Sequence, residues 1–277
     1  MVLHYSQLQK NIIQDLNVKP HFNAEQEINA RIQFLKSQLR ATELKSFILG
    51  ISGGIDSSVT GRLAQLAVEQ LREEHYPAHF IAVRLPYGKQ HDEEDAADAI
   101  KFINPDLILS INIKPACDET LRSIKESGYE FLSEAKEDFI LGNIKARQRM
   151  IVQYALANAH EGLVIGTDHA AEALMGFFTK FGDGACDLTP LTGLNKRRIR
   201  AIAAVLKAPE HLINKKPTAD LENLSPLKAD EDVFGVTYHH IDDFLEGKEV
   251  PEYVYENVTK AYTKTHHKRN LPKQHTE

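Results

Sequence analysis

The chain has 277 residues, 42% of them hydrophobic, and no linker rich in proline, glycine or serine divides it, so we expect a single domain over residues 1–277. The formal net charge of −6 argues against a protein that coats long nucleic acids, because such proteins are usually strongly basic. The 2 cysteines have no CxxC spacing and no apolar run is long enough to span a membrane, which predicts a cytoplasmic protein without a disulfide framework or a zinc ribbon.

Strands and helices are expected to alternate along the first two thirds of the chain. A helix over 23–40 is predicted because Ile28, Ile32, Leu35 and Leu39 recur at helical spacing. Short apolar runs bounded by turn residues predict strands. The expected strands are 46–51, 79–85, 106–113 and 163–166, and the other expected helices are 57–74, 92–102, 118–125, 134–159 and 196–206.

This alternation predicts an α/β fold: a doubly wound open parallel sheet with helices on both faces, because parallel strands need crossover connections. In such sheets ligands bind beyond the carboxyl ends of the strands, where the strand order reverses. The glycine-rich stretch 176–184 and the proline-containing stretch 209–226 are expected to be mobile loops that close over a substrate.

The strongest local pattern is Gly50-Ile-Ser-Gly-Gly-Ile-Asp-Ser-Ser58, between the first strand and its helix. Its glycines permit a tight turn that brings backbone N–H groups close to a ligand, and a helix N-terminus favours an anion. The pattern differs from a Walker A loop and from GxGxxG. Asp56 would repel a bare phosphate, so its presence fits a Mg²⁺ ion between carboxylate and phosphate. The spacing alone leaves open that Asp56 or Ser57 merely caps the helix.

The segment Ser52-Gly-Gly-Ile-Asp-Ser57 resembles the pyrophosphate-binding signature of the Rossmann-like N-type ATP pyrophosphatases, which cleave ATP between its α and β phosphates. Further segments resemble the ammonia-dependent NAD synthetase family, and this likeness runs from the N-terminal helix to the last ten residues. Ile55 stands where that family often has glutamine, which affects only a side-chain contact near the turn. The segments are Asn143–Arg149, Gly166–Glu172, Phe177–Gly184, Asp187–Lys196, Pro217–Leu221 and His266–Lys268.

The resemblance implies that the chain amidates deamido-NAD with ammonia, giving NAD, AMP and pyrophosphate through an acyl-adenylate, as the last step of NAD biosynthesis. It also implies ATP as co-substrate, Mg²⁺ as cofactor and a homodimer, to which the apolar face of the helix near 139–155 would contribute. The chain length leaves no room for the amidase domain of glutamine-dependent relatives, so free ammonia is the expected nitrogen source. Two alternatives remain: another N-type ATP pyrophosphatase, such as a tRNA-modifying ligase, and a non-catalytic nucleotide sensor of similar fold.

The resemblance also assigns roles to individual residues. Without it, Glu172 would be interpreted as a solvated helix residue and His267 and Lys268 as a basic tail. Asp56 and Lys196 are expected to be catalytic, and we hypothesise that Asp183 attracts ammonium and takes its proton. The residues expected to bind ATP are Gly50, Ile51, Ser52, Gly53, Gly54, Ile55, Asp56, Ser57, Thr167, Lys196 and Thr218. Those expected to bind deamido-NAD are Arg147, Lys180, Asp187, His267 and Lys268, and those expected to bind Mg²⁺ are Asp56 and Glu172.

Overall fold

A four-stranded parallel sheet lies at the centre of the computed structural model, which describes residues 6–88, 93–219, 224 and 228–275. Ser46 pairs with His79 on one side and with Gly162 on the other, so the first strand of the chain is central. The strand order is β3-β2-β1-β4. The strands are β1 (Ser46–Gly50), β2 (His79–Arg84), β3 (Leu107–Ser110) and β4 (Gly162–Val164). The prediction of an open parallel sheet is confirmed.

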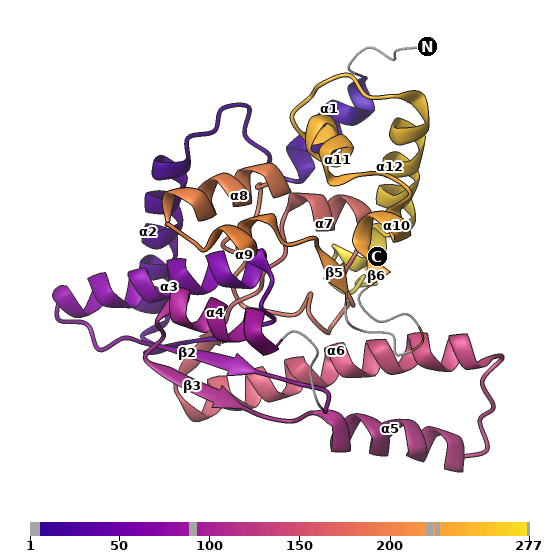
Figure 1. Cartoon of the computed structure of the whole chain (residues 1–277), viewed down its shortest axis with the longest axis horizontal. Helices are drawn as coiled ribbons and strands as arrows, with labels where there is room; N and C mark the ends of the chain where they lie inside the picture. The colour runs from indigo at the N-terminus through magenta and orange to yellow at the C-terminus, as the bar shows by residue number, and fades with distance from the viewer. Residues whose placement is uncertain (1–5, 89–92, 220–223, 225–227, 276–277) are drawn as a thin grey trace.

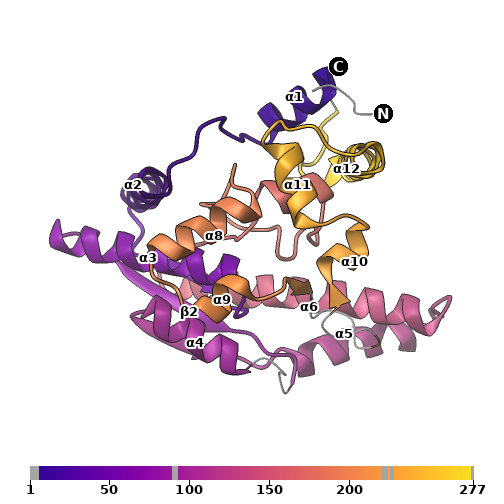
Figure 2. The same cartoon turned by 45° about the horizontal axis from the view of Figure 1, so that its top comes forward.

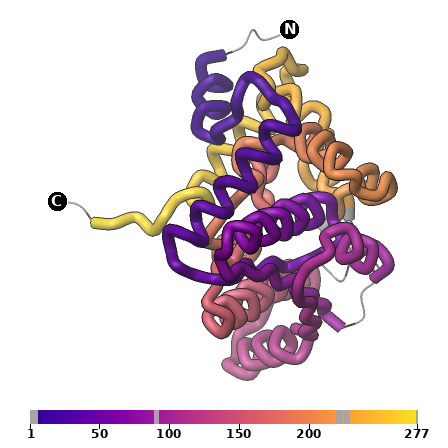
Figure 3. Tube along the Cα trace, turned by 90° about the vertical axis from the view of Figure 1, so that its left-hand side faces the viewer, coloured from indigo at the N-terminus to yellow at the C-terminus, as the bar shows by residue number. Residues whose placement is uncertain are grey.

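Helices cover both faces of this sheet, as predicted, because alternate residues of a strand point to opposite sides. Phe47 and Leu49 are buried in one apolar cluster with helices α2, α3, α4 and α8, whereas Ile48 is buried in another with α5 and α6. Figure 1 shows α3 and α4 on one side of the strands and α5 and α6 on the other, and Figure 3 shows α2 beside α3. The bounds are α2 (Ala24–Thr42), α3 (Ile55–Glu73), α4 (Glu93–Ile103), α5 (Lys114–Glu126), α6 (Glu134–Ala159) and α8 (Lys196–Val205).

A third apolar cluster joins the two ends of the chain. Ile12 of the N-terminal helix is buried with Phe244 and Val254 of the C-terminal helices, and Leu174 belongs to the same cluster. Figure 2 shows α1, α11 and α12 gathered at one end of the molecule. The helices of this cluster are α1 (Gln7–Asp15), α7 (Ala170–Met175), α10 (Asp230–Phe234), α11 (Tyr238–Leu245) and α12 (Glu252–Lys264).

The stretch 209–226, expected to be a loop, is more ordered than the sequence indicated. Its described part contains α9 (Glu210–Asn214) and β5 (Thr218–Ala219), and β5 pairs antiparallel with β6 (Lys228–Ala229). Residues 220–223 and 225–226 of this stretch, which include the end of the Pro217–Leu221 segment, lie outside the described residues. The last helical element of the described residues is a short 3₁₀ helix, η1 (His266–Lys268). Over the part of the chain that the structure describes, no helix is both long enough and apolar enough to cross a membrane.

Candidate active site

The strand order reverses between β1 and β4, because β2 and β3 extend the sheet to one side and β4 joins on the other. A cavity of about 520 Å³ opens beyond the carboxyl ends of these two strands, which is where open α/β sheets bind ligands. Most of the predicted site residues line it. These are Gly50, Ile51, Ser52, Gly54, Ile55, Asp56, Ser57, Thr167, Glu172, Asp183, Lys196, Thr218 and Lys268.

The turn after β1 has a backbone conformation that depends on its glycines. Gly53 has a φ of +83°, and a Cβ there would lie 2.9 Å from the backbone nitrogen of Ala96, so only glycine fits. Gly54 is the N-cap of α3 and brings no side-chain capping bond. Asp56 and Ser57 therefore lie inside the helix, which excludes the alternative that either one caps it. The α3 N-terminus is directed at the cavity with its positive end uncapped by a side chain.

Four polar side chains from three helices meet beside this turn. The ammonium of Lys196, on α8, lies 2.7 Å from Oδ2 of Asp56 and 3.2 Å from Nε2 of His169. The His169 Nε2 atom is also 3.6 Å from Asp56 Oδ1 and 3.5 Å from Glu172 Oε2. Lys196 is 1% exposed, so its charge acts in a medium that screens it poorly. The structure thus brings together Asp56, Glu172 and Lys196, three of the residues expected at the site, and adds His169.

Protonation states in this cluster follow from burial and from the neighbouring charges. Burial opposes the charge of Lys196, but Asp56 and Glu172 outweigh it and raise the pKa of the lysine. Burial likewise opposes ionisation of Asp56, yet Lys196 lowers its pKa. For Glu172, burial and then the charge of Asp56 raise the pKa well above its usual range although Lys196 opposes this, so a further cation at the site would favour the ionised carboxylate. Burial, and then Lys196, lower the pKa of His169 to about 3, so the imidazole is neutral.

This cluster fits a divalent cation. Oδ1 of Asp56 is buried and has no hydrogen-bond partner among the described residues. Ligand atoms of Asp56, His169 and Glu172 lie within 4.8 Å of one another. Both ring nitrogens of His169 already have neighbours: Nδ1 accepts the Glu172 N–H at 3.4 Å as the N-cap of α7, and Nε2 lies 3.2 Å from the Lys196 ammonium. The oxygen atoms of Asp56 and Glu172 are therefore the better ligands, and oxygen is what Mg²⁺ prefers.

Asp183 and Lys268 lie on the side of the cavity formed by the segment 176–184. Oδ1 of Asp183 accepts the backbone N–H of Thr179 at 2.9 Å. The ammonium of Lys268 donates to the carbonyl oxygens of Gly176 and Phe178, at 2.9 and 2.8 Å. Lys268, near the C-terminus, thus holds the segment that carries Asp183. The sequence did not indicate this contact.

Five predicted site residues do not line the cavity. Arg147 donates to the carbonyl of Lys180 at 3.2 Å, and Lys180 donates to the carbonyl of His267 at 2.7 Å, which links α6, the 176–184 segment and η1 at an exposed surface. Asp187 accepts the backbone N–H of Val164 at 2.7 Å and so holds the end of β4. The remaining residue is Gly53, which shapes the turn.

Sequence reasoning missed several residues that surround the cavity. Gln153 of α6 lines it and accepts the N–H of Gly50 at 2.8 Å, and Arg149 lies one turn earlier on the same helix. Asp168, between Thr167 and His169, is another perturbed carboxyl, because burial and the charges of Asp183 and Asp56 raise its pKa to about 8. His169 is the N-cap of α7 and precedes Glu172 by three residues. This spacing is typical of a helix N-terminus, so it is the signal by which the sequence could have indicated His169.

Comparison with known proteins adds the family. The family model described as NAD synthase matches residues 27–272. The NH(3)-dependent NAD(+) synthetase of Burkholderia cenocepacia is 58% identical over 97% of this chain and 95% of its own length. The crystal structure of NAD+ synthetase from Burkholderia pseudomallei has a TM-score of 0.83 at 53% identity, covering 95% of this chain and 96% of that one. The structure of NMN synthetase from Francisella tularensis has a TM-score of 0.81 at 34% identity, covering 93% of this chain and all of that one.

The matched range contains every element that forms the cavity, from β1 to η1. The fold, the position of the turn at the reversal of strand order and the similarity over nearly the whole chain agree with one another. The chain belongs to the NAD synthase family.

Proposed function

We propose that this chain catalyses the ATP-dependent amidation of deamido-NAD with ammonia, which yields NAD, AMP and pyrophosphate. The observation that carries the proposal is the ion pair between the buried Lys196 and Asp56 beside the turn after β1, at the place where the strand order reverses. The 58% sequence identity of this chain to an NH(3)-dependent NAD(+) synthetase supports this reaction over other reactions of proteins with the same fold.

In the first step a carboxylate oxygen of the nicotinate ring attacks the α-phosphorus of ATP. The bond from that phosphorus to the bridging oxygen breaks, and pyrophosphate leaves with the electron pair. Negative charge therefore grows on the leaving group, and groups already aimed at it lower the barrier most. We assign this task to the backbone N–H groups of the turn, to the hydroxyls of Ser52 and Ser57, and to the ammonium of Lys196. Thr167 and Thr218, which line the same cavity, are assigned to ATP binding.

Asp56 and Glu172 are the residues that would hold Mg²⁺. The orphaned Oδ1 of Asp56 and the raised pKa of Glu172 support this assignment, because a nearby divalent cation would satisfy the first and ionise the second. A bound Mg²⁺ would neutralise phosphate charge as pyrophosphate departs.

In the second step ammonia attacks the acyl carbon of the adenylate, a proton is lost from nitrogen, and AMP leaves. Ammonia is mostly ammonium near neutral pH, so a carboxylate that attracts the cation and takes its proton would raise the local concentration of the nucleophile. We assign this role to Asp183, which lines the cavity with Oδ1 held by the N–H of Thr179.

Deamido-NAD binding is assigned to Arg147, Lys180, Asp187, His267 and Lys268. Arg147, Lys180 and His267 lie outside the cavity and are joined by hydrogen bonds at an exposed surface. This position supports a substrate that extends between two subunits of a homodimer. Phe139 and Ile151 of α6 are 48% and 52% exposed, and such apolar side chains support a subunit contact along this helix. Light scattering of the purified protein tests the dimer, and the mass of one chain would refute it.

We also propose the cytoplasm as the location of the protein. Cys117 and Cys186 are free thiols, and thiols persist in reducing compartments.

The direct test incubates the protein with deamido-NAD, ATP, Mg²⁺ and ammonium and measures the products. We expect NAD and AMP in equal amounts. Nicotinate mononucleotide serves as a second substrate, because the NMN synthetase from Francisella tularensis has a similar structure. A preference for the mononucleotide would change the assigned substrate. ATP binding without release of pyrophosphate would indicate a nucleotide sensor, and a requirement for tRNA would indicate a tRNA-modifying ligase.

A further inference from the structure

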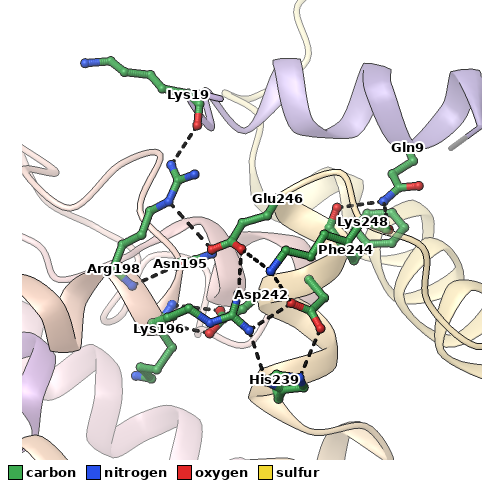
Figure 4. A network of polar contacts seen from close by, with 12 residues as sticks. Gln9, Lys19, Asn195, Lys196, Arg198, His239, Asp242, Phe244, Glu246 and Lys248 are labelled. Carbon is green, nitrogen blue, oxygen red and sulfur yellow. Dashed lines mark hydrogen bonds and ion pairs between the residues drawn. The ribbon is translucent and has the colours of Figure 1, made fainter. Parts of the chain in front are cut away.

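Helix α8 begins at the active site, and its first N–H groups are held by a carboxylate from another helix. Asp242 of α11 accepts the N–H of Lys196 at 3.0 Å and the N–H of Arg197 at 2.9 Å. Asn195 caps the next N–H, that of Arg198, at 2.9 Å. Figure 4 shows Asp242 facing the start of α8. Because Asp242 is 3% exposed, these bonds fix the backbone of Lys196 in a place that water scarcely reaches.

The same helix also contacts the other end of the lysine. The ammonium of Lys196 lies 4.9 Å from the centre of the Tyr238 ring, a cation–π distance. Tyr238 and Asp242 are four residues apart, so both project from one face of α11. One face of α11 therefore contacts Lys196 at two points, the backbone N–H and the side-chain ammonium.

Tyr238 further connects this face to the segment that carries Thr218. Its hydroxyl donates to Oδ2 of Asp230 at 2.9 Å, and both side chains are buried. The Asp230 N–H donates to the carbonyl of Pro217 at 3.3 Å, and Thr218 pairs with Ala229 across β5 and β6. Oδ1 of Asp230 is buried without a hydrogen-bond partner among the described residues, and Asp230 lines the cavity.

We propose that Tyr238 and Asp242 are positioning residues for the adenylation step, which hold the Lys196 ammonium beside the phosphate turn, and that Asp230 couples this arrangement to Thr218. The inference rests on the proposed function. Its physical basis is that a flexible lysine must be placed before pyrophosphate departs if it is to stabilise the growing charge. Loss of the ring would remove one contact of the lysine ammonium and leave its contacts with Asp56 and His169.

The test compares Tyr238→Leu with Tyr238→Phe and with Phe244→Leu. Tyr238→Phe keeps the ring and loses only the hydroxyl. Phe244→Leu is the matched control, because Phe244 is 0% exposed on the same helix but makes no contact with Lys196 among those described. ATP–pyrophosphate exchange reports adenylation, the KM for deamido-NAD reports substrate binding, and the melting temperature reports folding.

We expect Tyr238→Leu to lower the exchange rate by about tenfold or more, with the KM for deamido-NAD within about twofold of the wild type. Tyr238→Phe should retain the exchange rate at saturating ATP within about threefold, because the ring remains, but should raise the KM for ATP, because the bond that links Tyr238 to Asp230 is lost. Phe244→Leu should lower the melting temperature without lowering the exchange rate of the folded protein. Equal losses of exchange rate in Tyr238→Leu and Phe244→Leu would overturn the proposal.

Asp242→Asn gives a second comparison, with Asp243→Asn as its control. Asp243 also joins α11 to α8, through Arg197 at 2.9 Å, but does not hold the Lys196 backbone. We expect only Asp242→Asn to lower the exchange rate, since the N–H groups of Lys196 and Arg197 bind different oxygens of Asp242 and asparagine replaces one of these acceptors with an NH₂ donor. Equal effects of the two substitutions would contradict a role specific to Lys196.

A spectroscopic measurement separates this inference from the proposed function. In protein with isotope-labelled lysine, the ring current of Tyr238 should shift the ε-methylene signal of Lys196, assigned by its loss in Lys196→Arg. The shift should persist in Tyr238→Phe and vanish in Tyr238→Leu. An unshifted signal in the wild type would refute the positioning contact. If that shift is present while no NAD is formed, the proposed function fails and the contact stands.

Discussion

Lys196 and Asp56 lie 140 residues apart in the sequence, yet their charged atoms are 2.7 Å apart beside the turn that follows β1. The lysine comes from the first turn of α8 and the aspartate from the first turn of α3. Lys196 is buried and Asp56 is half-buried, so each charge is stabilised by the other, and both side chains line the same cavity. Their juxtaposition is what we expect of a site that binds a polyphosphate and its counter-ion.

Replacing Lys196 by methionine should remove the ammonium that meets the leaving pyrophosphate. We expect the rate of ATP–pyrophosphate exchange to fall by about 10²–10³-fold, the usual effect of losing one preorganised charge-stabilising group. The same change leaves the Asp56 carboxylate without its partner, so the metal-free variant should lose about 3 kcal/mol of stability. Thermal unfolding with and without Mg²⁺ checks this, and Mg²⁺ should restore part of the loss. An unchanged exchange rate would exclude Lys196 from catalysis.

Asp56→Asn and Glu172→Gln should each weaken metal binding, because each removes one of the two carboxylate ligands that we assign. Mn²⁺ binding in the presence of α,β-methylene-ATP, followed by electron paramagnetic resonance, measures this directly. We expect at least a tenfold rise in Kd, on the order of 1.4 kcal/mol. Glu161→Gln is the control, because Glu161 is a surface residue paired with Lys45. Metal affinity that survives both substitutions would place the ion elsewhere.

The two glycines of the turn should differ in what they tolerate. Gly53→Ala places a Cβ 2.9 Å from the backbone nitrogen of Ala96 at a φ of +83°, so we expect a loss of about 1–3 kcal/mol in the free energy of unfolding. At Gly54 the nearest atom to a Cβ is Oγ of Ser52 at 3.4 Å, an ordinary contact. Gly54→Ala should therefore fold normally but raise the KM for ATP. Equal nucleotide affinity in Gly54→Ala and the wild type would argue against close approach of phosphate to the turn.

Much of the sheet could be predicted from the sequence, because its signals are local. The apolar run before Gly50 and the long helix 134–159 appear in the structure with nearly the predicted bounds. The C-terminal helices could not be predicted in the same way, since their burial depends on the other end of the chain. Gln9, for example, donates to the carbonyls of Phe244 and Lys248, at 2.8 and 3.1 Å.

The site was only partly accessible to sequence reasoning for a similar reason. The turn after β1 has a spacing that indicates an anion, but nothing in the spacing around Lys196 indicates Asp56, His169 or Tyr238 as its neighbours. The resemblance to a family supplied Lys196 and Glu172. Asp242 and Tyr238 have the four-residue spacing of any helix face, so only the fold reveals that this face holds Lys196.

Asp183→Asn separates the two chemical steps. We expect the variant to form the adenylate at the wild-type rate, measured by pyrophosphate release in a single turnover, and to aminate it more slowly. The deficit should be largest near neutral pH, where most of the nitrogen source is ammonium, and should shrink as the pH rises and free ammonia increases. Amination at the wild-type rate across the pH range would remove Asp183 from this role.

Asp106 provides a prediction about stability and pH. It accepts the backbone N–H of Phe80 at 2.9 Å and a bond from Arg72 at 2.8 Å. Burial opposes its charge, but these donors and Gln65 lower its pKa. A lowered pKa in the folded state stabilises the protein above the unfolded pKa of about 3.9, and this contribution is lost as the pH falls through the folded value.

We therefore expect Asp106→Asn to cost about 1–2 kcal/mol at pH 7, a figure reduced because the side chain is partly exposed. The difference from the wild type should shrink below a pH of about 4. Urea unfolding followed by circular dichroism at several pH values measures both quantities. A difference that stays constant down to low pH would show that the charge of Asp106 is not responsible.

The most direct test of the central claim is a crystal structure of the protein with α,β-methylene-ATP and Mg²⁺, since this analogue resists cleavage between the α and β phosphates. The account predicts the triphosphate against the turn of residues 52–57, a metal ion contacting Asp56 and Glu172, and the Lys196 ammonium at a phosphate oxygen. A nucleotide bound elsewhere, with the turn empty and the Lys196–Asp56 pair unchanged, would contradict it.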